Sequence, residues 1–178
     1  MLRFTKTRSA RPIRPHRTAI VLLLLASLGA VRAPAQEAGA AGVPDAATAL
    51  AAWEAFAADP PARLDRTGPF LEYIRNGGAV HIVLDDGVLG FMYGDLDDTR
   101  KAVLYAAFLG ANMAAQLERG EPGSDNLAGM AGTLAAYRAL RAADPSLEVP
   151  ALEPFATAQA NGTLDAAVHA AVTGTAAP

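Results

Sequence analysis

Residues 97–120, DDTRKAVLYAAFLGANMAAQLERG, are the stretch that decides the fold. The two aspartates at its start place negative charge where a helix N-terminus favours it, and Gly120 is a typical helix-ending residue. No charged residue occurs between Ala102 and Ala111, and the large apolar side chains in this interval point to all sides of a helix. A helix that is apolar all round is normally enclosed by other helices. The stretch therefore predicts a buried central helix.

The few polar residues around this helix are the candidates for ligand binding. Asn112 and Gln116 lie one turn apart on one side of it. If these two side chains face a cavity, the helix lines a binding site, whereas if they bond to neighbouring backbone they hold the fold together. The full candidate set is His81, Tyr93, Tyr105, Asn112 and Gln116.

Helical patterns flank the central stretch on both sides. Apolar residues recur every three to four positions, and the segments are separated by proline, glycine and aspartate, which end and begin helices. Helices are expected over residues 45–58, 69–76, 126–143, 151–160 and 163–172. The sequence thus predicts a mainly α fold, a small orthogonal or irregular bundle of four to six helices around one central buried helix.

Residues 79–93 are the part where a β-structure is an alternative. Residues 79–84, AVHIVL, are the only ones rich enough in β-branched side chains to favour a strand, but a buried extended segment or a helical turn also fits. Residues 88–93, VLGFMY, would complete a minor β-hairpin across the turn at residues 85–87. We favour a helical turn for them, because their apolar side chains share a helical face.

The first 35 residues differ in kind from the rest. Six basic residues and no acidic one precede the apolar run AIVLLLLASLGAV at residues 19–31, and Ala33-Pro34-Ala35 fits the small-x-small pattern that signal peptidase cuts. The run is shorter than the roughly 20 residues of a membrane span, so a cleaved export signal is predicted, with an uncleaved membrane anchor as the alternative. We expect a signal peptide over 1–35, a flexible lead-in over 36–43, one helical domain over 44–172 and a frayed tail over 173–178.

Charge and composition indicate where the domain works. All 18 acidic residues lie after residue 35, together with eight basic ones, which gives a net charge of −10 without the leader. Such a surface disfavours nucleic acids and anionic membranes as partners. There is no cysteine for a disulfide or a lipid anchor, and the chain is rich in alanine. We therefore expect a periplasmic or secreted protein without membrane insertion after cleavage.

Aspartates around the start of the central helix are the only local concentration of metal-ligand types. Asp95 and Asp97 resemble the beginning of a calcium-binding loop, but the glycine and glutamate that complete an EF-hand are absent. Turn formation and helix capping account for these residues, so no metal and no cofactor are predicted. Asp95, Asp97 and Asp98 are the weak candidates for metal binding.

No catalytic signature is present in the sequence. The two serines after the leader lie in expected loops, and His81 and His169 do not have a zinc-site spacing. His81 stands in an apolar run and is interpreted as a core or boundary residue. The leading hypothesis is a non-enzymatic binding or interaction module for a protein partner or a small ligand. The alternatives are a small metal-assisted hydrolase, using His81 with Asp85, Asp86 or Asp95, and a structural envelope protein.

Overall fold

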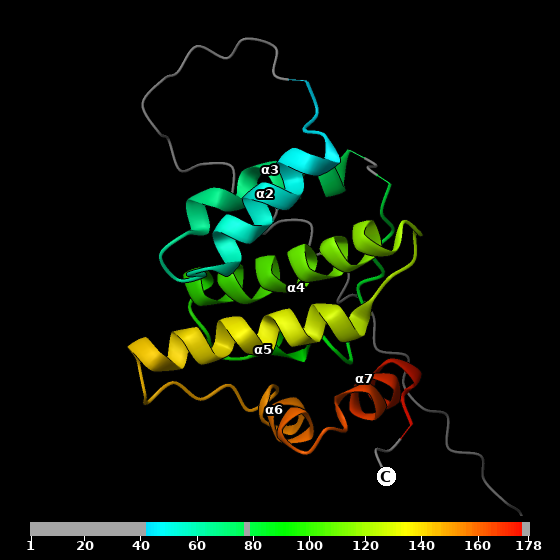
Figure 1. Cartoon of the computed structure of the whole chain (residues 1–178). Coiled ribbons are helices and arrows are strands. Elements are labelled where there is room, and N and C mark those ends of the chain that lie inside the picture. The colour runs from blue at the N-terminus through cyan, green and yellow to red at the C-terminus, as the bar shows by residue number, and fades with distance from the viewer. Residues whose placement is uncertain (1–41, 77–78, 176–178) are drawn as a thin grey trace, which may run out of the picture. The chain divides into compact units, whose positions relative to one another are not determined.

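The computed structural model describes residues 42–76 and 79–175. Within these ranges the chain is mainly helical and contains no strand, which confirms the predicted fold class (Figure 1). The predicted signal peptide and most of the lead-in lie outside the described residues. The elements are α2 (Ala46–Ala57), η2 (Leu64–Arg66), α3 (Thr67–Arg75), η3 (Gly90–Tyr93), α4 (Asp98–Arg119), α5 (Asn126–Ala143), α6 (Glu153–Ala160) and α7 (Leu164–Thr173).

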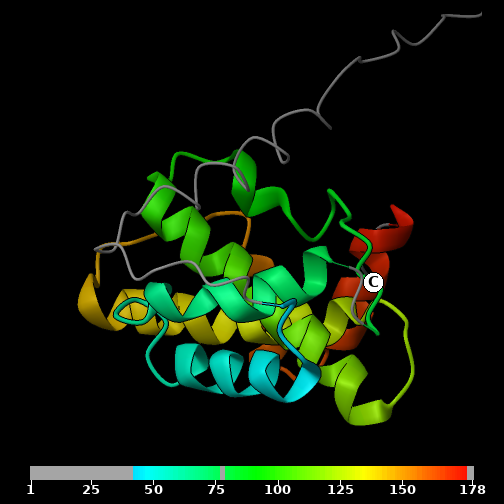
Figure 2. The ribbon, with the colours of Figure 1, turned by 90° about the horizontal axis from the view of Figure 1, so that it is seen from above.

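Helix α4 occupies the centre of the bundle, as its sequence predicts. Its most extensive contact is with α5, α2 and α3 pack on another side, and α6 and α7 pack against α5. All residues from 102 to 110 are buried. In Figure 2, α4 runs obliquely across α5, an arrangement that fits an irregular bundle rather than a set of parallel helices.

Aspartate side chains fix the starts of three helices. Asp45, Asp97 and Asp125 each accept a hydrogen bond from the backbone N–H three residues later, at 2.8, 2.9 and 2.8 Å. These bonds satisfy N–H groups that have no partner within the helix. At the other end of α4, Gly120 adopts the left-handed conformation with φ 70°, which glycine reaches without steric cost. The capping interpretation of Asp97 is therefore confirmed.

Two glycines let neighbouring helices approach α4 closely. A Cβ added at Gly132 of α5 would lie 2.5 Å from the Cβ of Ala111 and 2.8 Å from the carbonyl oxygen of Ala107. A Cβ added at Gly110 would lie 2.1 Å from the ring of Trp53, so this tryptophan of α2 packs directly on the α4 backbone. Since neither contact leaves room for a side chain, the helix spacing depends on both glycines.

Residues 79–93 form neither a strand nor a hairpin, so the β alternative was wrong for this part of the chain. Residues 80–85 run without a turn or bend, a turn follows, and η3 confirms the helical turn that the apolar face of 88–93 predicts. The other described segments around them are helices and loops, which offer no strand to pair with. Val83 and Leu84 are 49% and 41% exposed, so the segment is not a buried extended one either.

No helix of the described part combines the length and the apolar character that crossing a bilayer requires.

Candidate functional site

Gln116 uses all of its hydrogen-bonding capacity inside the protein. Its Oε1 accepts from the backbone N–H groups of His81 at 2.8 Å and Gly123 at 2.9 Å. Its Nε2 donates to the carbonyl oxygen of His81 at 3.0 Å and to Oδ1 of Asn112 at 2.7 Å. An amide has two donors and room for two acceptor bonds, so no group of this buried side chain remains for a ligand.

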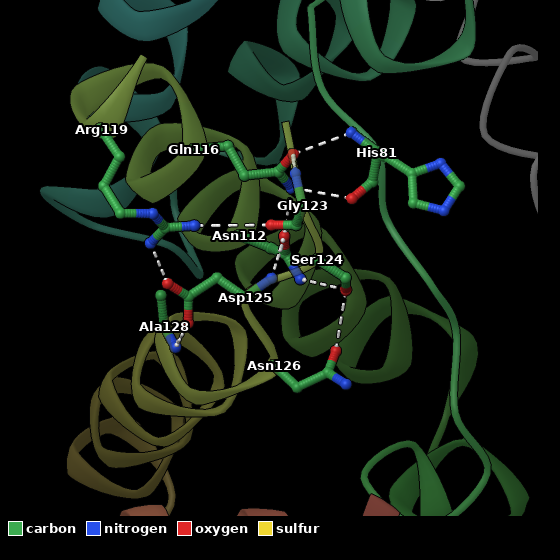
Figure 3. Close-up of polar contacts among 9 residues, drawn as sticks. All are labelled: His81, Asn112, Gln116, Arg119, Gly123, Ser124, Asp125, Asn126 and Ala128. Carbon is green, nitrogen blue, oxygen red and sulfur yellow. Dashed lines mark hydrogen bonds and ion pairs between the residues drawn. The ribbon is translucent and has the colours of Figure 1, made fainter. Parts of the chain in front are cut away.

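Asn112 extends the same network into the loop between α4 and α5. Its Oδ1 also accepts from the backbone N–H of Asp125 at 3.0 Å, and its Nδ2 donates to Oγ of Ser124 at 3.3 Å. The side chain is 0% exposed. Figure 3 shows the two amides side by side, with the residue 79–85 segment on one side and the α4–α5 loop on the other.

We call this arrangement the polar clamp: the side chains of Asn112 and Gln116 with the backbone groups of His81, Gly123 and Asp125 that they bind. The polar clamp attaches the segment around His81 and the α4–α5 loop to α4. Its bonds satisfy backbone groups that have no helix or sheet partner. No buried side-chain nitrogen or oxygen of the described residues lacks a partner. The two amides therefore bond to neighbouring backbone, the arrangement that holds a fold together.

The side chain of His81 lies outside the polar clamp. It is exposed, and Figure 3 shows the imidazole pointing away from Gln116 while the backbone of the same residue faces it. The expectation of a core or boundary histidine was therefore wrong. The apolar neighbours of His81 in sequence do not place it in the core, because the segment is held through its backbone.

The two candidate tyrosines have different surroundings. The hydroxyl of Tyr93 donates to Oδ1 of Asp86 at 2.6 Å, and the side chain is 40% exposed. Tyr105 is 3% exposed, and burial raises the pKa of its hydroxyl to about 12. The five candidates do not converge on one pocket. The structure brings together Asn112, Gln116 and only the backbone of His81.

The candidate aspartates serve the helix and its turns. Asp97 caps α4 and lies 3.4 Å from the Nε of Arg100, while Asp98 stands in the first turn of the helix. Asp85 accepts from the backbone N–H of Gly87 at 2.8 Å, as a turn residue does. The described residues contain no group of three or more histidine, aspartate or glutamate side chains placed to hold one metal ion.

A groove of about 420 Å³ lies between α5 and α6, and the sequence alone does not predict it. On α5, Leu134 and Tyr137 belong to the apolar stripe of an amphipathic helix, whereas the sequence predicts that Arg138 and Arg141 face water. Only the packing of α6 beside them makes these four residues one wall of a groove. Its lining consists of Leu134, Tyr137, Arg138, Arg141, Ala156, Gln159 and Ala160.

Two arginines give this groove its charge. Arg138 of α5 bonds to Oε1 of Gln159 across the groove, and no described carboxylate pairs with it. Arg141 lies with its guanidinium carbon 5.7 Å from the centre of the Tyr137 ring, within the range of a cation–π contact. Its nearest carboxylate oxygen is that of Glu153, at 3.9 Å. Both guanidinium groups therefore keep donors for a bound anion.

Tyr137 fixes the wall of the groove. Its hydroxyl donates to Oε1 of Glu153 at 2.6 Å and accepts from the backbone N–H of Val149 at 3.1 Å. Burial and the bond to Glu153 raise the pKa of this hydroxyl. The bond to Val149 holds the link between α5 and α6 against α5. Glu153 lies closer to the hydroxyl of Tyr137, at 2.6 Å, than to the guanidinium of Arg141, at 3.9 Å.

Comparison with known protein families, with curated proteins and with solved structures found no match. The function is therefore inferred from the residues of this chain.

The buried tyrosine gives a testable pH dependence. The pKa of Tyr105 is about 12 in the folded protein against 10 in an unfolded chain, so folding favours the neutral phenol. The neutral phenol contributes on the order of 2 kcal/mol to the free energy of unfolding. This contribution is complete below pH 10 and is lost as the pH rises to 12. Urea unfolding between pH 9 and 12 should show that the free energy of unfolding falls less steeply with pH in Tyr105→Phe than in the wild type. An identical pH dependence of the free energy of unfolding in the two proteins would contradict the raised pKa of Tyr105.

Proposed function

We propose that the protein is an exported, non-enzymatic binding module whose α5–α6 groove holds a ligand with an apolar body and one anionic group. The observation that supports this is the pairing of an apolar floor with Arg138 and Arg141 at the same groove. The domain has 18 acidic residues and eight basic ones after the leader. Beside this groove the two arginines face one carboxylate, that of Glu153 at 3.9 Å from Arg141, so they form a local positive site.

The dimensions and chemistry of the groove fit a small amphipathic acid. Its volume lies within the roughly 300–1,000 Å³ typical of small-molecule sites, which combine apolar walls with a few polar groups that orient the ligand. Ala156 and Ala160 supply apolar surface above the buried Leu134. A guanidinium can bind a carboxylate through two parallel hydrogen bonds. The side chain of Gln159 already holds Arg138 across the groove, so that arginine is oriented before a ligand binds.

Removing the two positive charges should abolish the preference for an acid. Isothermal calorimetry is expected to show binding of octanoate and none of octylammonium, which has the same chain with the opposite charge. In the double variant Arg138→Gln/Arg141→Gln, octanoate binding should weaken by about tenfold or more, because charge-assisted hydrogen bonds are lost.

Arg63→Gln is the matched control, since this exposed arginine lies outside the groove and should leave octanoate binding unchanged. Octan-1-ol, a neutral ligand of the same chain length, should bind the wild type and the double variant equally. Equal binding of octanoate and octylammonium to the wild type would overturn the proposed function, as would undiminished octanoate binding by the double variant.

The export part of the proposal rests on the leader sequence and is tested separately. Signal peptidase cleavage after Ala35 would leave Gln36 as the first residue. The intact mass of the protein isolated from the periplasm or medium of a bacterial host should match residues 36–178. An uncleaved chain in the membrane fraction would favour the anchor instead.

A further inference from the structure

Residues 80–84 have a backbone edge that is bound on one side only. His81 exchanges two hydrogen bonds with the side chain of Gln116, and the N–H of Val83 donates to Oγ of Ser124 at 3.1 Å. In an extended chain the backbone groups of successive residues point to opposite sides. His81 and Val83 therefore direct their backbone groups toward the protein, and the residues between and beside them direct theirs away from it.

We call these outward groups the open edge: the backbone N–H and C=O groups of Val80, Ile82 and Leu84. No described residue donates to them or accepts from them. The segment also has the β-branched composition of a strand, although the described residues supply no second strand. A row of unpaired backbone groups of this kind is a template for an added strand.

We propose that the open edge binds an extended peptide segment of another protein, which adds to residues 80–84 as an antiparallel strand. This surface is distinct from the α5–α6 groove, and the proposal does not depend on the groove. Main-chain hydrogen bonds to Val80, Ile82 and Leu84 would supply the affinity. The exposed side chains of Val83 and Leu84 offer apolar contacts beside the edge.

Charge at the end of the edge defines the chemistry of the partner. Asp85 and Asp86 follow the open edge directly, and neither forms an ion pair within the described residues. Asp85 is held by the N–H of Gly87 and Asp86 by the hydroxyl of Tyr93, so both carboxylates have fixed positions. A partner strand with lysine or arginine at its N-terminal end complements them in an antiparallel pairing.

A second copy of this chain fits the open edge less well. Antiparallel self-pairing centred on Ile82 places Ala79 opposite Asp85, and therefore provides no positive charge there. It also brings together two domains that each carry a large excess of acidic residues. A basic peptide avoids both disadvantages.

The test uses two fluorescently labelled peptides of identical composition, KKVTVTV and VTVTVKK, and measures their anisotropy with the purified protein. KKVTVTV should bind about fivefold more tightly, because only its lysines lie beside Asp85 and Asp86 in an antiparallel pairing. Backbone N-methylation of one alternate set of its residues should abolish binding. Methylation of the other set should leave binding unchanged, since only one set faces the open edge.

Two protein variants locate the binding site. Ile82→Pro removes an outward N–H, and proline fits an extended chain, so peptide binding should fall more than tenfold without a change in thermal unfolding. Asp85→Asn/Asp86→Asn retains the side-chain acceptors for Gly87 and Tyr93 but removes the charge. It should erase the preference for KKVTVTV over VTVTVKK.

Several results would overturn the proposal. These are no binding of either peptide, equal binding of the two N-methylated forms, and binding that Ile82→Pro leaves intact. A dimer in light scattering that Ile82→Pro converts to a monomer would also overturn it, because a second copy would then hold the edge. If Ile82→Pro unfolds the protein, the N-methylated peptides decide the question on the wild type.

Discussion

Replacing Gln116 with alanine is expected to lower the free energy of unfolding by about 3 kcal/mol. The substitution leaves the N–H and C=O of His81, the N–H of Gly123 and one bond of Asn112 without their partner. A buried polar group that loses its partner costs roughly 1–3 kcal/mol, and water reaches the partly buried His81 backbone, which limits the total. Urea unfolding measures the effect.

Three controls separate the polar clamp from simple packing. Gln116→Met retains most of the volume and should be nearly as destabilising as alanine, because the hydrogen bonds and not the methylenes carry the effect. Asn76→Ala removes an exposed amide that follows α3 and bonds to the carbonyl oxygen of Glu72 in its last turn, and should be close to neutral. Amide exchange at His81 and Gly123 should accelerate in both Gln116 variants. A loss below about 1 kcal/mol with unchanged exchange would show that the polar clamp does not hold these segments.

Gly132→Ala should lower the free energy of unfolding by about 2 kcal/mol, although alanine is the better helix former. The new Cβ would lie 2.5 Å from the Cβ of Ala111 and 2.8 Å from the carbonyl oxygen of Ala107. The backbone of α4 cannot rotate away as a flexible side chain can. Helices α4 and α5 must therefore separate, and the separation disturbs the most extensive helix contact in the fold.

Gly68→Ala is the matched control for this substitution. Gly68 also lies in a helix, and apart from its two chain neighbours nothing stands within 4 Å of the position that its Cβ would take. The control should stay within about 1 kcal/mol of the wild type, because the better helix propensity of alanine is opposed by Pro69, which disfavours a helical residue with a Cβ before it. Thermal unfolding of both variants decides the point, and a Gly132→Ala variant at least as stable as the wild type would contradict the close approach of α4 and α5.

Local sequence patterns were enough to predict the helices. The unbroken apolar stretch of α4 has only one stable environment, the interior, and Asp97 and Asp125 mark helix starts by their capping geometry. Trp53 supplies the largest apolar surface of α2, and it packs on Gly110, where the missing side chain leaves room for it. Helix patterns and caps depend on residues that are close to one another along the chain, so they can be recognised in the sequence.

The functional features depend on residues far apart in the chain. Nothing in AVHIVL indicates that Gln116, 35 positions later, takes the place of a neighbouring strand for His81. Residues 121–125, EPGSD, have the pattern of a loop that ends in a helix-capping Asp125, but nothing in this pattern indicates that Ser124 and Asp125 bind Asn112. Arg138 and Arg141 read as solvent-facing residues until α6 packs beside them.

NMR mapping of bound octanoate is the sharpest test of the proposal that the α5–α6 groove is the ligand site of this protein. The largest shifts in an amide correlation spectrum are expected for Tyr137, Arg138, Arg141, Ala156 and Gln159, while the residues of the polar clamp remain unshifted. Shifts centred on Asn112 and Gln116, or none at saturating octanoate, would contradict it.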